Sequence, residues 1–419
     1  MRTQHPSAIR PATTGFIFIT VLLDMVAIGI MAPVLPKLII SFEQDDMTRA
    51  ASVAGVIGLT WAGMQFVFSP IVGALSDRYG RRPVILLSNL GLGLDYVIMA
   101  IAPSVAWLFV GRALSGIFGA SFATATAYVA DVTPEEKRAG RIGLLGAAFG
   151  IGFVLGPAIG GTLGELDLRL PFWLAAALSL ANAAYGYFVL PESLAVEHRA
   201  KLEGQIVNPF GPLKLLRSNA DILGLAVAAF LCFLAHESLH ATFVLYTDYR
   251  YAWSAHQVGL ALSLVGIGSA IVAGLLVRPA VARCGEHPVM FAGLILGAIG
   301  FTAYAIAPTG TVFLAATPLL SLWGLAGPAI QSSMTRNVGP SEQGRLQGAL
   351  SSLRGMAGLV GPLLFTQTFV VGIRGGHATS GAPYMVVAIL LIVAIAAVTA
   401  APRLARRPSF QRVFRLRQS

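Results

Sequence analysis

Charged side chains are scarce in this sequence, since aspartate, glutamate, lysine and arginine make up only 11% of its 419 residues. Cysteine occurs twice, as Cys232 and Cys284, so neither a disulfide framework nor a cysteine-based metal site is expected. The sequence also lacks a glycine-rich phosphate loop ending in Lys-Ser or Lys-Thr, which argues against ATP as an energy source. We therefore expect no cofactor and no resident metal.

Apolar residues are abundant instead, at 56% of the chain, with a mean hydropathy of +0.74. The 46 glycines and 23 prolines fit membrane helices, which tolerate both residues. A helix that crosses a bilayer needs about 20 mainly apolar residues. Twelve segments meet this requirement: 14–40, 51–75, 83–102, 105–130, 140–164, 171–190, 219–247, 256–278, 287–307, 311–335, 345–370 and 383–401. The sequence thus predicts an all-α polytopic membrane protein with twelve transmembrane helices.

The two halves of the chain repeat each other. The pattern Gly80-x-x-Pro83 recurs 205 residues later as Gly285-x-x-Pro288. Such parallel repeats predict two pseudo-symmetric six-helix bundles. The expected parts are an N-terminal bundle, a cytoplasmic central linker, a C-terminal bundle and a basic cytoplasmic tail, at residues 1–190, 191–218, 219–402 and 403–419.

Basic residues predict the orientation in the membrane, because they concentrate on the cytoplasmic side. If both termini are cytoplasmic, the inside segments hold 22 lysines and arginines. The outside loops then hold four, namely Arg49, Arg169, Arg250 and Arg374. We therefore expect a multi-pass protein of the inner (plasma) membrane with both termini in the cytoplasm. The net charge of +10 then reflects topology and contact with membrane lipid, so no nucleic-acid partner is expected.

A short polar island separates the second and third apolar segments. It contains two glycines, one carboxylate and three arginines, at Gly73, Asp77, Arg78, Gly80, Arg81 and Arg82. One such charge at mid-membrane costs about 2.5–3.5 kcal/mol, so the island is predicted to be a tight loop at the membrane surface. An ordinary cytoplasmic hairpin is the alternative. The order G-x-L-S-D-R-x-G-R-R-P resembles the gate-forming loop between helices 2 and 3 of the major facilitator superfamily.

Three ionisable residues lie inside the predicted spans. Asp24 lies near the middle of the first, Asp95 in the third and Arg112 in the fourth. Such residues are functional candidates, because an intramembrane charge is costly and needs a partner. Burial disfavours the charged form of a carboxyl group, so Asp24 and Asp95 are candidate proton carriers. A structural ion pair is the alternative reading, and Asp24 is the expected partner of Arg112.

The fifth span is rich in glycine at helical spacings. Its motif comprises Gly152, Gly156, Pro157, Gly160 and Gly161. Small residues at these spacings allow two helices to approach closely and slide. Glycines are common in membrane helices, so packing alone does not identify a function. The run resembles the helix-5 motif of exporters in the same superfamily.

The seventh span contains His236-Glu237-Ser238-Leu239-His240, which matches the zinc-protease pattern H-E-x-x-H. A catalytic zinc usually needs a third protein ligand, and no second motif supplies one. A membrane metalloprotease is therefore the remote alternative. The stronger hypothesis is a polar face that contacts the substrate, as a proton site or a site for a metal-chelated ligand. The third reading is that the histidines bond to neighbouring helices.

Most of the chain resembles the tetracycline/proton antiporters. The resemblance rests on Leu23-Asp24, Met64-Gln65-Phe66, Leu94-Asp95-Tyr96, Gly111-Arg112, Tyr128-Val129-Ala130-Asp131 and Gly344-Arg345-Leu346-Gln347-Gly348. It implies a transporter rather than an enzyme, exporting a drug from the cytoplasm in exchange for an entering proton. It assigns Asp24, Asp95, Gln65 and Arg112 to the cavity. It assigns Asp77, Arg81 and Asp131 to the cytoplasmic gate.

The sequence departs from that family at three positions. Gly297 replaces an acid of helix 9, Ser269 replaces a histidine of helix 8, and Glu237 replaces a cavity glutamine of helix 7. We therefore hypothesise that Glu237 has taken over proton coupling. Tetracycline, free or as a divalent-metal chelate, is the leading substrate. A carrier for another amphiphilic metabolite on the same fold is the alternative.

Overall fold

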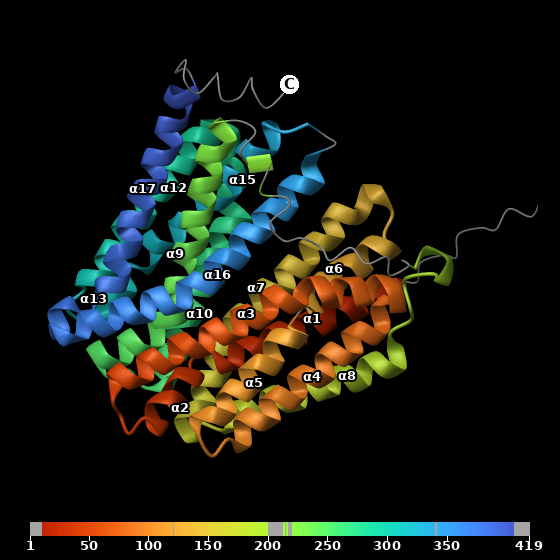
Figure 1. The fold of residues 1–419 in the computed structure, drawn as a ribbon, viewed down its shortest axis with the longest axis horizontal. Coiled ribbons are helices and arrows are strands. Elements are labelled where there is room, and N and C mark those ends of the chain that lie inside the picture. Colours follow the sequence, from red (N-terminus) through yellow and green to blue (C-terminus); the bar gives the residue numbers. More distant parts are fainter. Residues whose placement is uncertain are drawn as a thin grey trace, which may run out of the picture. The chain divides into compact units, whose positions relative to one another are not determined.

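The computed structural model describes residues 11–119, 121–199, 213, 215–216, 220–339 and 342–405. Every regular element within these ranges is a helix (Figure 1). Twelve helices in this part of the chain are long and apolar enough to cross a membrane, which confirms the predicted fold class. Residues 200–212 of the expected linker and 406–419 of the expected tail lie outside the described residues.

The first half of the chain forms six of these spans. Two of them are built from consecutive helices, α1 with α2 and α5 with α6. The helices are α1 (Pro11–Met31), α2 (Leu35–Phe42), α3 (Met47–Tyr79), α4 (Arg81–Ile101), α5 (Val105–Phe118), α6 (Ser121–Val132), α7 (Glu135–Leu166) and α8 (Leu170–Val189).

The second half forms the other six spans, and two of them contain breaks in regular α-helix. A π-helical segment, η3 (Val272–Leu276), interrupts one span, and a short 3₁₀ segment, η4 (Trp323–Leu325), interrupts another. The helices are α9 (Ala220–Tyr251), α10 (Ala255–Ile271), α11 (Val277–Cys284), α12 (Glu286–Ile306), α13 (Gly310–Ala315), α14 (Thr317–Leu322), α15 (Ala326–Arg336), α16 (Gln343–Arg374) and α17 (Ala382–Ala405).

Packing divides the chain into two compact units. One comprises Met1–Leu38, Thr60–Gln205 and Ser254–Ser263, and the other Ile39–Leu59, Ile206–Trp253 and Leu264–Ser419. Each unit thus contains one short segment from the opposite half of the sequence. The start of α10 belongs to the first unit, and the start of α3 belongs to the second.

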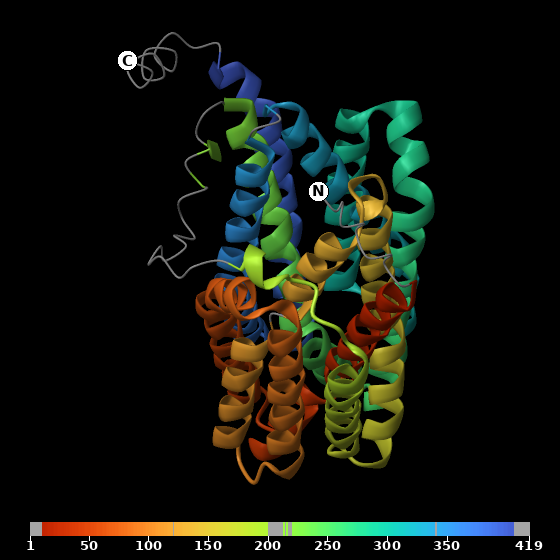
Figure 2. The same cartoon turned by 90° about the vertical axis from the view of Figure 1, so that its right-hand side faces the viewer.

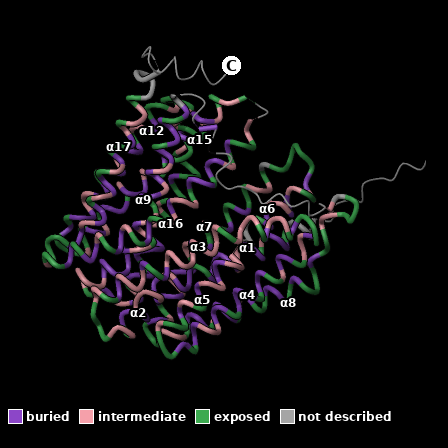
Figure 3. The backbone as a smooth tube through the Cα atoms, in the orientation of Figure 1, coloured by how far each residue is buried: buried purple, intermediate pink, exposed green. Residues whose placement is uncertain are grey.

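In the first unit, α1 packs against α7 and α8, and α4 packs against α5 and α8. Its core includes Ile17 and Val21 of α1, Tyr128 of α6 and Leu145 of α7, all buried. Each helix of this unit buries one side and exposes the other. Figure 3 shows this as alternating buried and exposed segments along α4 and α8.

The second unit is organised around α9, which packs against α16 and α17 (Figure 2). Its core is aromatic: Tyr246, Tyr304, Phe313 and Tyr384 are fully buried. The ring centroids of Tyr304 and Phe313 lie 3.8 Å apart, and those of Tyr246 and Tyr384 lie 5.0 Å apart. Such contacts stabilise helix packing beyond the apolar area that they bury.

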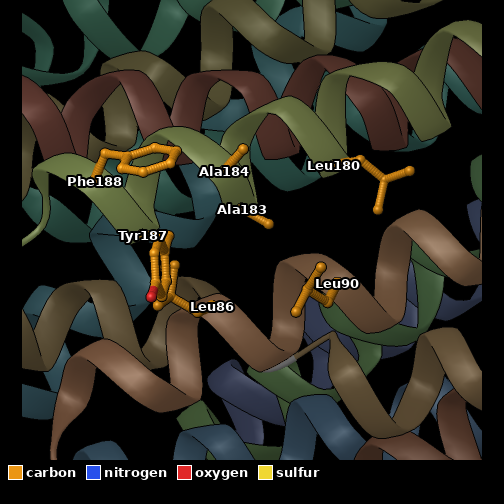
Figure 4. A pocket seen from close by; sticks show the side chains of 7 residues that line it. All are labelled: Leu86, Leu90, Leu180, Ala183, Ala184, Tyr187 and Phe188. Carbon is orange, nitrogen blue, oxygen red and sulfur yellow. The ribbon is translucent and has the colours of Figure 1, made fainter.

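The outward surface is apolar, as a membrane-spanning surface requires. A groove of this kind lies between α4 and α8, lined by Leu86, Leu90, Leu180, Ala183, Ala184, Tyr187 and Phe188. Figure 4 shows the ring of Tyr187 close to Leu86, with Phe188 beside it on α8. Phe188 is 82% exposed, which is unusual for so large an apolar side chain unless lipid covers it.

The polar island is helical rather than a loop, so the sequence prediction was wrong here. Helix α3 continues through Asp77 to Tyr79, and α4 begins at Arg81. Only Gly80 separates them, with φ of 108°, a conformation that glycine adopts without a side-chain clash. Helix ends at the membrane surface can carry these charges, because their side chains reach water. Gly285, with φ of 83°, separates α11 from α12 in the same way.

Candidate functional site

Asp95 and Arg112 form a buried ion pair within the first unit. The Nη2 atom of Arg112 donates to Oδ2 of Asp95 at 2.6 Å, and the two side chains are 6% and 0% exposed. Gly111 makes room for the carboxylate, since a Cβ atom there would lie 2.7 Å from Asp95 Oδ1. The expectation that Asp24 pairs with Arg112 was therefore wrong. Helices α4 and α5 are neighbours joined by a short turn, so the carboxylate of α4 reaches the arginine instead.

Asp24 of α1 has amide partners. Asn182 of α8 donates to Asp24 Oδ1 at 2.9 Å and also to the carbonyl oxygen of Thr20 at 3.0 Å. Asn89 of α4, with its amide oriented so that donors face acceptors, donates to Asp24 Oδ1 and Oδ2 at 3.1 and 3.2 Å. The carboxyl group of Asp24 is buried and accepts hydrogen bonds from amide side chains of two other helices.

The polar island forms a charge network on the first unit. Arg81 Nη1 contacts Asp77 Oδ1 at 2.5 Å, and Arg81 Nε contacts Asp131 Oδ2 at 3.0 Å. Arg81 Nη1 also donates to Ser76 Oγ at 3.1 Å. The one-residue turn at Gly80 thus brings Asp77 and Arg81 together, and α6 supplies Asp131, so the three charged residues named for the cytoplasmic gate are in contact.

Glu192, which the sequence reasoning missed, completes this network. Its carboxylate accepts from the backbone N–H groups of Arg81 at 2.8 Å and Arg82 at 3.2 Å, so it caps the start of α4. A Cβ atom at Gly80 would lie 2.2 Å from Glu192 Oε2. The only signal in the sequence was an acidic residue directly after the sixth apolar segment, at Pro191-Glu192.

The remaining residues of the island have lesser contacts. The Arg82 Nη2 atom donates to the carbonyl oxygen of Tyr187 at 2.6 Å, and the Arg78 guanidinium lies 5.2 Å from the ring centroid of Tyr79. Gly73 has open space around the position of a Cβ atom. Gln65, further along α3, is half-buried, and its Nε2 atom lies 3.1 Å from where a Cβ of Gly119 would be.

The equivalent turn of the second half also carries an ion pair, but the positions of the cation and the anion are exchanged. Glu286 follows Gly285 as Arg81 follows Gly80, and Arg336 lies 205 residues after Asp131. Arg336 Nε contacts Glu286 Oε1 at 3.1 Å. Ser332 Oγ also donates to Glu286 Oε1, at 2.5 Å. The pair therefore repeats with its charges exchanged.

The glycine motif of α7 forms a tight seam with α1. Cβ atoms built on Gly152, Gly156 and Gly160 would lie 2.4, 2.6 and 1.9 Å from Met25, Gly29 and Ile30, respectively. At Gly156 and Gly160 the nearest atoms belong to the backbone of α1, which cannot rotate away. The motif therefore enforces direct backbone contact along one side of α7.

A neighbouring side of α7 contacts the start of α10. A Cβ atom at Gly161 would lie 2.5 Å from the carbonyl oxygen of Ala255, and one at Gly259 would lie 2.3 Å from that of Pro157. Ser263 Oγ donates to the carbonyl oxygen of Val154 at 2.6 Å. The five motif residues thus divide between two helix contacts within the first unit.

The second unit has a related seam between α16 and α9, but a side chain occupies it. A Cβ atom at Gly361 would lie 2.3 Å from Cβ of Glu237. Glu237 is half-buried there. Its neighbours His236 and His240 are exposed, with ring centroids 4.9 Å apart. Within the described residues, no group of three or more His, Cys, Asp or Glu side chains is placed to hold a metal ion.

Side chains crowd the position of Gly297, so any larger residue there would have to displace them. A Cβ atom there would lie 2.7 Å from Cδ1 of Trp323 and 3.0 Å from Cδ1 of Leu391. The Trp323 ring in turn lies 5.9 Å from the ring of His236. The indole thus occupies the space beside the position where the family resemblance led us to expect a carboxylate.

Arg354 of α16 is a second residue that the sequence reasoning missed. Its side chain is exposed, and the guanidinium carbon lies 4.8 Å from the ring centroid of Phe233 on α9. The signal was present: an arginine within the predicted span 345–370.

A sequence profile of the Major Facilitator Superfamily matches residues 17–251 and 225–417. The repeated six-span architecture, the buried charges and this match agree. The chain belongs to the Major Facilitator Superfamily, whose members are transporters and not enzymes. The metalloprotease alternative has no support from the comparisons.

Within the superfamily, the chain groups with the tetracycline resistance proteins. It is 37% identical to the class C tetracycline resistance protein of Escherichia coli over 378 residues. This alignment covers 90% of this chain and 94% of the relative. A human organic anion transporter matches at 25% identity with a TM-score of 0.68, over 94% of this chain and all of that one. A nucleoside transporter matches with a TM-score of 0.76, over 93% of this chain and 99% of the transporter. The two sequences are only 12% identical, so this match supports the fold alone.

Proposed function

We propose that this protein exports a drug-like small molecule, with tetracycline as the leading substrate, in exchange for entering protons. The observation that carries the proposal is the similarity over nearly the whole chain to proteins that are named for tetracycline resistance. We further propose that the bundles 1–190 and 219–402 open alternately to the two sides of the inner membrane. Both termini lie in the cytoplasm in this account, and lipid contacts the basic flanks.

Proton coupling is assigned to Asp24, Asp95 and Glu237. Asp24 is a buried carboxyl group that accepts hydrogen bonds from the amides of Asn89 and Asn182. Asp95 is tied to Arg112, and we assign this pair to positioning as well as coupling. Glu237 lies at a helix seam where a change of charge would alter the contact with α16.

The cytoplasmic gate is assigned to the network of Asp77, Arg81 and Asp131, supported by Arg78 and Arg82. The Arg81 side chain is only 11% exposed, whereas Asp77 is 52% exposed, so we propose that the network holds the closed gate and that water replaces its contacts when the gate opens. We propose that α1 and α7, held in close backbone contact by the glycine seam, move together as one rigid body. Gln65, His236 and His240 are proposed to contact the substrate, either free or as a divalent-metal chelate.

Transport by everted membrane vesicles tests the proposal. Vesicles containing the protein should accumulate radiolabelled tetracycline when respiration acidifies their interior, and a protonophore should abolish the accumulation. Accumulation no greater than in vesicles lacking the protein would contradict drug export. Accumulation that survives the protonophore would contradict proton coupling.

Glu237→Gln separates the two roles proposed for this residue, since glutamine keeps the size and hydrogen bonding but cannot titrate. We expect slower tetracycline accumulation and a flatter dependence of the rate on external pH. A rate, affinity and pH profile equal to those of the wild type would show that Glu237 is a tolerated polar residue.

An organic anion or another amphiphilic metabolite is the second candidate substrate. The specific observation is the 25% identity to a human organic anion transporter across its full length. Uptake of aromatic carboxylates by the same vesicles, in place of tetracycline, would favour this candidate.

A further inference from the structure

Arg354 lies within a membrane span yet remains exposed. It is the twelfth residue of α16, whose 32 residues form one span. An arginine in such a segment faces a bundle interior or a water-filled space, because contact with lipid tails is costly. An apolar groove on α16 is lined by Leu359, Val360, Leu363 and Leu364. Leu363 follows Arg354 by nine residues, so the two project from α16 about 180° apart. Arg354 therefore points away from this apolar surface.

The guanidinium of Arg354 is held but not neutralised. Its carbon lies 4.8 Å from the ring centroid of Phe233, a cation–π contact that restrains the side chain. Among the residues that the structure describes, no carboxylate forms an ion pair with it. Its donors remain available to a bound molecule.

The helix opposite Arg354 presents complementary groups. Three polar residues lie on the same side of α9 as Phe233, because they follow it by three, four and seven residues. They are His236, Glu237 and His240. Because Phe233 contacts the guanidinium of Arg354, this side of α9 faces Arg354. An aromatic ring, a carboxylate and two imidazoles are thus gathered beside a restrained cation.

We propose that Arg354 is a substrate-binding residue that recognises an ionised oxygen of an aromatic amphiphile. The planar guanidinium donates two parallel hydrogen bonds to such a group, and Phe233 fixes its orientation. Glu237 and the imidazoles then face the cationic or metal-chelating part of the same molecule. This inference rests on the proposed function, and it names the substrate class as aromatic molecules with an anionic oxygen.

Equilibrium binding to the purified full-length protein in nanodiscs tests the inference. The probes are tetracycline, which carries an ionised enol and an ammonium group, nalidixic acid, which carries only a carboxylate, and ethidium, which carries only a cation. The variants are Arg354→Met, Arg354→Lys and the control Arg374→Met, which removes an exposed arginine from the far end of the same helix.

Arg354→Met should weaken binding of tetracycline and nalidixic acid by about tenfold or more, the loss expected for a charged hydrogen bond. Ethidium binding should change by less than about twofold, and Arg374→Met should bind all three probes as the wild type does. Arg354→Lys should be intermediate, because it keeps the charge but loses the planar fork.

Three results would overturn the inference. The first is that Arg354→Met binds both anionic probes as tightly as the wild type does, which would mean that Arg354 only helps to orient the helix in the membrane. The second is an equal loss of all three probes, which would make its role structural. The third is a wild-type protein that binds neither anionic probe. If vesicles fail to transport tetracycline but nalidixic acid still binds in an Arg354-dependent manner, the proposed drug export fails and this inference stands.

Discussion

The Gly80 and Gly285 turns begin equivalent helices but hold their charges in opposite order. In the first, the cation follows the glycine and its partner Asp131 lies at 3.0 Å; in the second, the anion Glu286 follows and Arg336 lies at 3.1 Å. What repeats is the pair and not its sign. The first turn is also held by Asp77 and Glu192, whereas Ala282 stands where Asp77 would be in the second. The first turn is thus the more strongly constrained of the two.

The two glycine seams, between α1 and α7 and between α9 and α16, also differ in the atoms that face the glycine. At Gly156 the neighbouring atoms are the backbone of α1, whereas at Gly361 they belong to the side chain of Glu237. A backbone contact fixes the distance between helices, and the Cβ atom of Glu237 is equally fixed, but the rest of the Glu237 side chain can change its rotamer or charge. The α1–α7 seam at Gly156 therefore has backbone atoms on both sides, whereas the α9–α16 seam at Gly361 includes an ionisable side chain.

The largest effect is expected from Gly156→Leu. Its side chain would collide with Gly29 and Val26 of α1, and overpacking of this kind costs at least about 1–3 kcal/mol where the neighbour cannot move. Tetracycline transport should fall close to zero. Gly150→Leu is the matched control, since a Cβ atom there meets nothing within 4 Å and its transport should stay near that of the wild type. Equal transport by the two variants would contradict a rigid seam.

A smaller effect is expected when alanine replaces the two turn glycines. Both positions have positive φ, where a side chain costs about 1–3 kcal/mol of strain. Gly80→Ala also collides with Glu192, whereas a Cβ at Gly285 meets nothing within 4 Å. Thermal unfolding of the purified proteins should therefore show a larger loss of stability for Gly80→Ala. A larger loss for Gly285→Ala would reverse the comparison between the turns.

The smallest effect is expected at the charge-exchanged pair. Arg336 is 75% exposed although Glu286 is only 11% exposed, so solvent screens the pair from one side and it contributes on the order of 1 kcal/mol to stability. Arg336→Glu should slow transport several-fold by placing two like charges together, with little change in protein amount. The double variant Glu286→Arg, Arg336→Glu should restore the rate, because it reproduces the charge order of the first turn. No recovery in the double variant would show that the sign of the pair matters in itself.

The fold was predictable from the sequence because the bilayer requires about 20 apolar residues per span, and few other features mimic that pattern. The identities of Asp24, Asp95 and Arg112 as intramembrane charges followed from the same segments. Their pairing did not, because it depends on how each helix is rotated about its axis. Whether Asp95 of α4 or Asp24 of α1 reaches Arg112 depends on the rotation of all three helices, α1, α4 and α5.

Two residues escaped the sequence reasoning for different reasons. Glu192 lies in a connection, and its capping role exists only because the chain returns from α8 to the start of α4. Arg354 was hidden by the hydropathy of its span. The topology count uses all but three of the 29 lysines and arginines, and the remaining three are Lys37, Arg112 and Arg354. Examining each basic residue that topology leaves unexplained would have identified Arg354.

The most direct test of the account is the movement of protons that accompanies the drug. Proteoliposomes loaded with a pH-sensitive dye, and containing the wild-type protein, should show a proton flux when tetracycline is added with Mg²⁺ to one side. Asp24→Asn should bind tetracycline but show no drug-dependent proton flux, because asparagine cannot carry a proton. A flux in Asp24→Asn equal to that of the wild type would contradict the central claim that the buried carboxyl group of Asp24 couples drug export to proton entry.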